Sequence, residues 1–196
     1  MPENSAPFEI IAAPFTAWLA PIGTAFPAIQ AEPAATWLKL GKSGDKNISE
    51  DGVSVTHPQS LEFFRTLGST LPRKAVRTEE DVMISFTLLD LTLEMYRKVL
   101  NDNGLSEVVA ASGIAGVKKL SLARGRIVTQ HALLLRGPSA YGENWTAQYK
   151  IPIVVHVGEP ELSFTKGEPA GLLFEFQAIE SDTLPELEMQ NAEALA

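Results

Sequence analysis

Residues 81–89 read DVMISFTLL. Every second position on one side holds an apolar residue: Val82, Ile84, Phe86 and Leu88. The other side holds Met83, Ser85, Thr87 and Leu89. Alternation with a period of two predicts a β-strand with one buried face. We therefore expect residues 81–89 to form a strand that places Phe86 in the core.

The period of the apolar residues changes directly after this strand. Four residues after the strand recur at helical spacing: Leu93, Tyr96, Val99 and Leu100. Asp90 or Thr92 can cap the first turn, because a side-chain oxygen accepts a hydrogen bond from an otherwise unpaired backbone N–H. Asn103-Gly104 is a suitable C-terminal stop. The pattern predicts one short helix.

Strand patterns also occur on both sides of this segment. Before it, we expect strands over 35–40 and 53–56, with a turn at Asp51-Gly52. After it, we expect four more strands, over residues 117–122, 126–135, 146–156 and 172–179, separated by glycines and Gly137-Pro138. The sequence predicts a mainly β fold, an antiparallel sandwich or open barrel with one short flanking helix. Residues 1–181 would form a single domain.

The first 32 residues contain a long uncharged stretch. Residues 10–29 carry no charge, which is long enough for a membrane-spanning helix. Pro14, Pro21 and Pro27 argue against a helix, because each removes a backbone donor and clashes with the preceding turn. Glu3 and Glu9 precede the stretch where a signal peptide would have basic residues. We expect residues 1–32 to be an extended, packed arm.

No period is evident in residues 57–81, which lie within a longer segment of about 42–81. This region combines apolar and basic residues that suit an interface: Phe63, Phe64, Arg65, Leu67, Arg73, Lys74 and Arg77. Exposed aromatic side chains are unfavourable in water and are good interface residues. The alternative is a solvated loop. We favour a functional loop or long hairpin that docks on an acidic surface.

The chain supplies such an acidic surface near its C-terminal end. Residues 157–196 hold nine acids and one base, whereas residues 1–156 hold 15 of each. The net charge of −8 therefore comes from the last fifth of the chain. This distribution disfavours nucleic-acid binding, which needs clustered Lys and Arg. A basic loop and an acidic region on one subunit can support head-to-tail assembly.

The sequence contains no combination of residues typical of an enzyme. There is no cysteine, which excludes thiol nucleophiles, thiolate metal sites and disulfides. His57, His131 and His156 lack metal-ligand spacing, and we interpret His131 as a core or subunit-contact residue and His156 as a polar residue at a strand end. Glu79 and Glu80 would face opposite sides of a strand. No nucleophile elbow or phosphate-binding loop is present. We expect no catalytic residue, no cofactor and no metal.

Three segments together resemble the major tail tube proteins of long, flexible-tailed phages and related gene transfer agents. The first is APIGTAFP at residues 20–27. The second is WLKLG at residues 37–41 with ISEDGV at residues 48–53. The third is RKAVRTEEDVMISFTLL at residues 73–89, followed by the predicted helix. Their order and spacing match over residues 18–104, and the second half of the chain matches only in its strand pattern.

This resemblance implies a structural virion protein that assembles with copies of itself. Six copies would form a ring, and rings would stack into a tube. The segment of about 42–81 would reach the neighbouring ring. The other partners would be a tape-measure protein inside the tube and terminator and tip proteins at its ends. Double-stranded DNA would pass through the lumen without specific binding, and the phage tail would be assembled in the host cytoplasm, with no membrane involved.

Acidic groups in a lumen wall would repel DNA and limit its adhesion. The candidates are Glu159, Glu161, Glu175 and Glu180. The acidic segment 182–196 has room only for an arm and no further domain. The sequence leaves open whether this segment is a helix that docks on a neighbour or is disordered.

Two other classes of protein remain as alternatives. One is another small β virion protein, such as a tail terminator, a head–tail connector or a decoration subunit. The other is a β-sandwich carbohydrate-binding module or hydrolase. The latter needs an exposed aromatic platform or a carboxylate pair, but Trp18, Trp37 and Trp145 are scattered in sequence.

Overall fold

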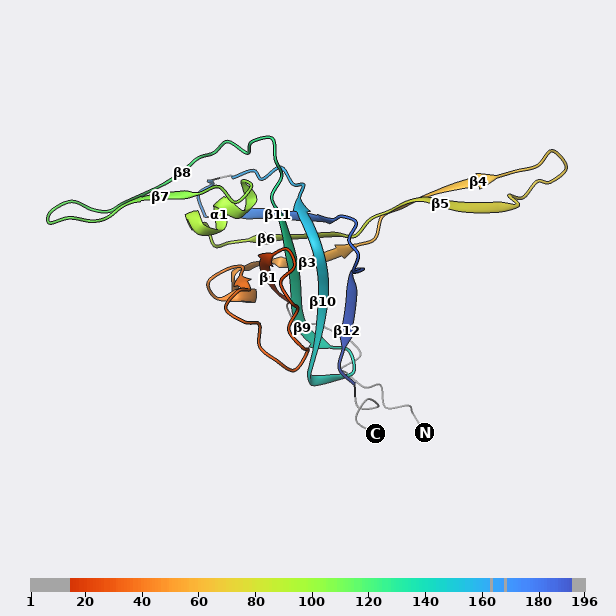
Figure 1. The fold of residues 1–196 in the computed structure, drawn as a ribbon, viewed down its shortest axis with the longest axis horizontal. Helices are drawn as coiled ribbons and strands as arrows, with labels where there is room; N and C mark the ends of the chain where they lie inside the picture. Colours follow the sequence, from red (N-terminus) through yellow and green to blue (C-terminus); the bar gives the residue numbers. More distant parts are fainter. Residues whose placement is uncertain (1–14, 163, 168, 192–196) are drawn as a thin grey trace.

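The computed structural model describes residues 15–162, 164–167 and 169–191. The fold is mainly β, with antiparallel sheets and one short α-helix, as predicted from the sequence (Figure 1). The main sheet follows the order β2 (Leu38–Lys39), β1 (Thr16–Pro21), β9 (Gln130–Ser139), β10 (Gly142–His156), β11 (Leu172–Ala178), β6 (Met83–Leu88) and β3 (Ile48–Thr56). An eighth strand, β12 (Glu186–Met189), also pairs with β10.

The long strand β10 connects two parts of the sheet. On one side it pairs with β9 along nearly its whole length, and on the other side its first half pairs with β12. A shift in register between Ile151 and Val154 follows, and the last residues of β10 pair with β11. Such irregularities bend a strand. Figure 1 shows β3, β6 and β11 running across the direction of β9, β10 and β12. The bent sheet thereby folds over its own apolar face.

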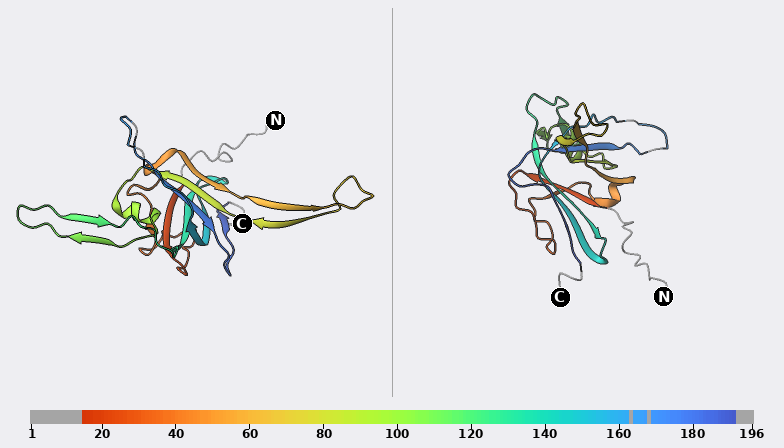
Figure 2. Two further views of the ribbon diagram at one scale, coloured as in Figure 1. Left: turned by 90° about the horizontal axis from the view of Figure 1, so that it is seen from above. Right: turned by 90° about the vertical axis from the view of Figure 1, so that its right-hand side faces the viewer.

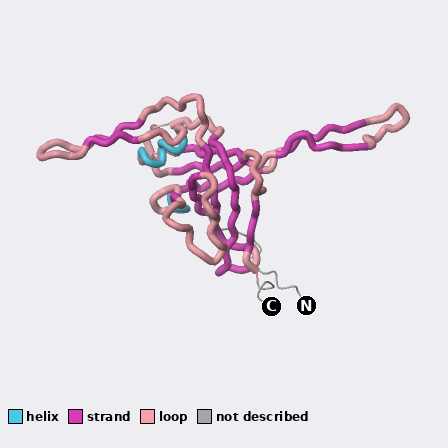
Figure 3. Tube along the Cα trace, viewed as in Figure 1, coloured by secondary structure: helices cyan, strands magenta, loops and turns pink. Residues whose placement is uncertain are grey.

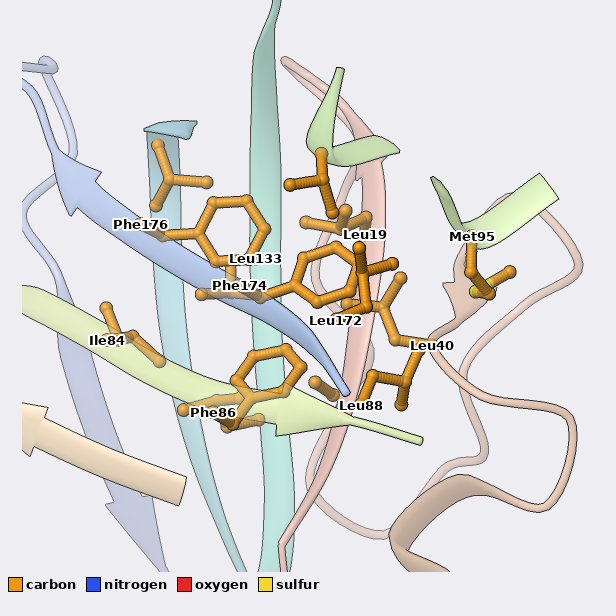
Figure 4. Packing of buried hydrophobic residues seen from close by; sticks show 14 of the residues in the cluster. Leu19, Leu40, Ile84, Phe86, Leu88, Met95, Leu133, Leu172, Phe174 and Phe176 are labelled. Atoms are coloured by element: carbon orange, nitrogen blue, oxygen red, sulfur yellow. The ribbon is translucent and has the colours of Figure 1, made fainter. Parts of the chain in front are cut away.

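The main core lies between these two parts of the sheet. Strand β6 contributes Ile84, Phe86 and Leu88, all buried, which confirms the predicted alternation. Phe174 and Phe176 of the neighbouring strand β11 lie beside them on the same face of the sheet. The other contributors shown in Figure 4 include Leu19, Leu40, Met95, Leu133 and Leu172. Burial of these side chains is the main favourable contribution to the fold.

Helix α1 (Leu93–Val99) covers one end of this core. Met95 and Val99 are buried, and Thr92 precedes the first turn. The predicted stop at Asn103-Gly104 is wrong by two residues, because Asn101 and Asp102 already adopt positive φ angles of 71° and 54°. Asn and Asp tolerate this left-handed conformation better than most residues.

The expected N-terminal arm is partly a strand of the main sheet. Residues 1–14 lie outside the described residues. Thr16–Pro21 form β1, which lies between β2 and β9. This segment is extended and packed, as expected, but it is a strand of the main sheet, because β1 buries Ala17 and Leu19 in the main core. Pro21 ends the strand, where its missing donor costs least.

The uncharged stretch after β1 covers the other face of the sheet. Trp37 and Phe26 pack against Ala132 and Leu134 of β9, and the two aromatic rings lie 5.1 Å apart. This second cluster also includes Ala20 and Trp18. Trp37 is 5% exposed, so it offers no aromatic platform for a carbohydrate. Packing explains the absence of charge at the buried positions of β1, whereas Ile22 and several of its neighbours are exposed.

Several local predictions near glycine and at the C-terminal end need correction. The predicted strand 35–40 is reduced to β2. Asp51-Gly52 is a bulge inside β3, with a φ of 72° at Gly52, and not a turn between strands. Gly137 and Pro138 lie inside β9 and do not separate two strands. A Cβ atom at position 137 would lie 2.8 Å from the ring of Phe15, which explains why this residue is glycine. Residues 186–189 of the predicted acidic tail form β12, which Lys150 holds through Glu188.

Two hairpins extend from opposite sides of the body (Figures 1 and 2). One is formed by β4 (Gln59–Phe64) and β5 (Lys74–Glu80). The other is formed by β7 (Leu105–Val108) and β8 (Val117–Leu120). In both, the two strands pair only with each other (Figure 3).

Candidate assembly surfaces

The segment without a sequence period contains the first hairpin. The predicted segment of about 42–81 divides into two parts: residues 48–56 form β3 in the main sheet, and residues 59–80 form the β4–β5 hairpin. Its strands lack alternation because neither face packs on the body. All positions of β4 and β5 are exposed.

The hairpin exposes large apolar side chains. Phe63 is 56% exposed, Phe64 53% and Leu67 fully exposed. Leu61 and Leu71 are exposed as well. The hairpin therefore brings the predicted interface residues together on one projecting element. Apolar patches of this kind are typical of interaction surfaces.

We call residues 63–77 the basic tip. They hold four bases, Arg65, Arg73, Lys74 and Arg77, and no acid. Arg65 donates a hydrogen bond of 2.7 Å from Nη1 to the carbonyl of Thr70, which orders the turn. Arg77 forms an ion pair of 2.9 Å with Glu80. The side chains of Arg73 and Lys74 are exposed, and neither has a polar partner in the part of the chain that the structure describes.

The β7–β8 hairpin is a second projecting element, and it was not predicted from the sequence. Its tip, residues 108–117, contains no charge. Val109 is 81% exposed and Ile114 68%. A tight turn at Ser112-Gly113 closes the hairpin, with a φ of 75° at Gly113. This Ser-Gly pair between apolar residues is the signal that could have revealed the hairpin. An ion pair of 2.6 Å between Lys118 and Glu94 connects its base to α1.

An acidic surface begins directly after β11 and includes β12. We call residues 179–189 the acidic strip, because they hold Glu180, Asp182, Glu186 and Glu188 and no base. Glu188 accepts hydrogen bonds from Gln148 and Lys150. Burial raises the pKa of Glu188, but these bonds outweigh it and hold the pKa below its usual range. The other three acids are exposed and unpaired among the described residues.

The four predicted lumen acids do not form one group. Glu175 is half-buried on β11, and its carboxylate lies next to Gly158. Glu159 and Glu161 are exposed in the loop that starts there. Glu180 lies beyond the other end of β11 and belongs to the acidic strip. Which of these acids would line a lumen stays a prediction.

Two of the three histidines, His131 and His156, lie near the C-terminal end of α1. His131 is buried, as expected, and its Nε2 lies 3.4 Å from Asp102. Burial raises the pKa of Asp102, but its hydrogen bonds with His131, Lys98 and Arg97 outweigh this effect and hold the pKa well below its usual range. His156 is the last residue of β10, as expected, but it is half-buried and its ring packs edge-on against two core phenylalanines. Burial lowers the pKa of His156 to about 4.

A hollow of about 170 Å³ adjoins both histidines and Arg124. Of the groups around it, Lys98 and His131 contact Asp102, and Arg124 donates to the carbonyl of Gly158. The Nε2 atom of His156 is buried and has no hydrogen-bond partner among the described residues. No group of His, Asp and Glu suited to a metal occurs among the described residues. The arrangement serves to join α1, β9 and the following loop.

Comparisons with known proteins add no family. A scan of the sequence against models of known families found no match, and a search of curated proteins found none either. Within the described part of the chain, no helix is long and apolar enough to cross a membrane.

Proposed function

We propose that this chain is a structural subunit that assembles with its own copies, as the major tail tube protein of a long-tailed phage. The observation that carries this proposal is the pair of hairpins extending from opposite sides of one body. Each presents apolar side chains to solvent. A subunit with two unlike adhesive ends forms head-to-tail contacts, which generate rings or open stacks.

The body is well suited to hold such hairpins in place. The β4–β5 hairpin continues directly from β3 and β6, which pair with each other in the main sheet. The β7–β8 hairpin follows α1 and is connected to it by Lys118. Both therefore start from elements that pack on the core, so their directions are set by the fold.

The tube would also need a lumen to which DNA does not adhere. Glu159 and Glu161 lie in the loop after β10, and Glu175 lies on the neighbouring β11; none of the three forms an ion pair among the described residues. In our proposal these acids and Glu180 are the candidates for the lumen wall. The subunit would act without catalysis or a cofactor, in the virion, alongside a tape-measure protein.

Electron microscopy of the purified full-length chain tests the proposal. We expect rings or tubes, because the exposed hairpins provide contacts in two directions. Added salt should first favour assembly by screening like charge between subunits with a net charge of −8. A chain that remains monomeric by sedimentation at every concentration and salt level would contradict self-assembly.

The alternative within the same class is a terminator, connector or decoration subunit. Opposite hairpins favour a repeating tube over these roles, because a terminator needs only one adhesive end. Rings that form but never stack would favour the alternative.

A further inference from the structure

We propose that the basic tip of one copy docks on the acidic strip of a second copy. This inference rests on the proposed self-assembly and names the two surfaces that meet. Residues 63–77 carry a charge of +4 without any acid, and residues 179–189 carry −4 without any base. Arg77 is already paired with Glu80, and Glu188 with Lys150, so three bases and three acids remain to complement each other.

The acidic strip offers shape as well as charge. A hollow of about 480 Å³ lies on one side of it, between Asp182, Phe26 and Pro152. A second hollow of about 400 Å³ lies on the other side, between Glu180, Leu184 and Val82. Ser181 and Thr183 line both hollows, so this stretch forms a ridge between them.

Apolar groups at these hollows match the side chains of the basic tip. Ile22 is 50% exposed beside the first hollow, and Leu184 is 75% exposed beside the second. Phe63 and Phe64 of the basic tip are exposed next to Arg73 and Lys74. An aromatic ring in a hollow with a charged pair at its rim is a common arrangement of interface residues.

The two surfaces of one chain cannot meet each other. Glu80, at the base of the hairpin, lines the same hollow as Glu180. From this base the hairpin extends away from the body, so its own tip lies far from the strip (Figures 1 and 2). The occupant of the strip is therefore a second copy.

The charges also decide which type of contact forms. Two acidic strips facing each other would repel, and so would two basic tips. A symmetric dimer through either surface is therefore disfavoured. A contact between the basic tip and the acidic strip joins two unlike surfaces. A pair of copies joined in this way still has one free tip and one free strip, so further copies can be added. Under this inference Glu180 serves the contact and not the lumen.

Engineered cysteines test the contact directly, because the chain has no cysteine of its own. Full-length chains with Arg73→Cys or Lys74→Cys are mixed with differently tagged chains carrying Asp182→Cys or Glu186→Cys. A short bismaleimide linker then joins neighbouring thiols. We expect cross-linked pairs of unlike chains in at least one of the four mixtures. The matched control is Glu107→Cys, an exposed glutamate on the opposite hairpin, which should not cross-link to either tip variant.

A charge exchange provides a second measurement. The variant D182K/E186K should raise the protein concentration needed for half-assembly roughly tenfold or more. Adding R73E/K74E to the same chain should restore assembly, since the charges at positions 73 and 74 and at positions 182 and 186 are then exchanged and again opposite in sign. If each pair of substitutions only disturbed its own surface, the two effects would add and assembly would not be restored.

The outcomes separate this inference from the proposed function. Rings or tubes of the unmodified chain, without tip-to-strip cross-links above the control in any mixture, would overturn the contact and leave self-assembly standing. Tip-to-strip cross-links from a chain that forms only pairs would support the contact and contradict the tube. Cross-links together with restored assembly would support both.

Discussion

Phe86 of β6 and Phe174 of β11 stack in the core, with ring centroids 5.2 Å apart and ring planes 10° apart. Phe86 is 3% exposed and Phe174 fully buried. The substitution Phe86→Ala should lower the free energy of unfolding by about 3–5 kcal/mol, because it removes buried area and leaves a cavity. Urea denaturation measures this loss. Phe64→Ala on the exposed hairpin is the matched control and should change stability little. Equal effects of both would contradict the assignment of the core.

Asn101 should stabilise the loop that precedes β9. Its Nδ2 donates to the carbonyls of Arg124 and Ile127, and its Oδ1 accepts from the amide of Thr129. Asn101→Gly keeps the φ of 71° accessible and removes only these bonds. Asn101→Ala adds backbone strain, so it should cost about 1 kcal/mol more than the glycine variant. Urea denaturation ranks the variants, and faster amide exchange at Thr129 should accompany both.

His156 should make stability depend on pH below neutrality. Its pKa is lowered to about 4 in the folded chain by burial, and an unfolded histidine titrates near about 6.5. The unfolded chain therefore binds the proton first as pH falls, so stability should decrease from about pH 6.5 to about pH 4. Urea denaturation at a series of pH values measures the slope. His156→Phe should flatten it, whereas the exposed His57→Gln should leave it unchanged.

One physical reason explains why β6 was predictable from the sequence and why the hairpins were harder to predict. A strand alternates when one face is buried and the other is not, as at Phe86 and Ser85. The β4–β5 hairpin buries neither face on the body, so residues such as Phe63 and Phe64 follow each other without a period. Its composition was still distinctive, because the segment combined aromatic and basic residues.

Long-range pairing explains the other errors. Strand β12 is four residues long and holds two glutamates, and nothing in Glu186–Met189 indicates a strand. It forms because Lys150 and Gln148 of β10 bind Glu188. These partners are about 40 positions away in sequence, so local patterns carry no signal of them. The negative charge of the acidic strip was therefore predictable from the sequence, but its position next to β10 was not.

Charge reversal at the basic tip should hinder assembly and leave the subunit folded. Arg73 and Lys74 are exposed and have no polar partner among the described residues, so R73E/K74E removes no intramolecular contact. Thermal unfolding should stay within about 0.5 kcal/mol of the unmodified chain. Electron microscopy should show few or no rings and tubes. K42E/K46E reverses two exposed lysines on the body and serves as the matched control. Normal polymerisation of R73E/K74E would show that the tip has no docking role.

The apolar tip of the β7–β8 hairpin should be a second, independent contact. Val109 and Ile114 are highly exposed and flank the turn at Ser112-Gly113. Charges introduced there by V109D/I114D would have to be buried in any interface that covers the tip, and this is strongly unfavourable. Assembly measured by sedimentation should therefore weaken, with urea denaturation unchanged because neither side chain belongs to the core. V109T/I114T, which keeps the branched shape without charge, should retain more assembly than the aspartate variant. If the aspartate variant assembles as well as the unmodified chain, this tip faces solvent in the assembly and the contacts in that direction lie on the body.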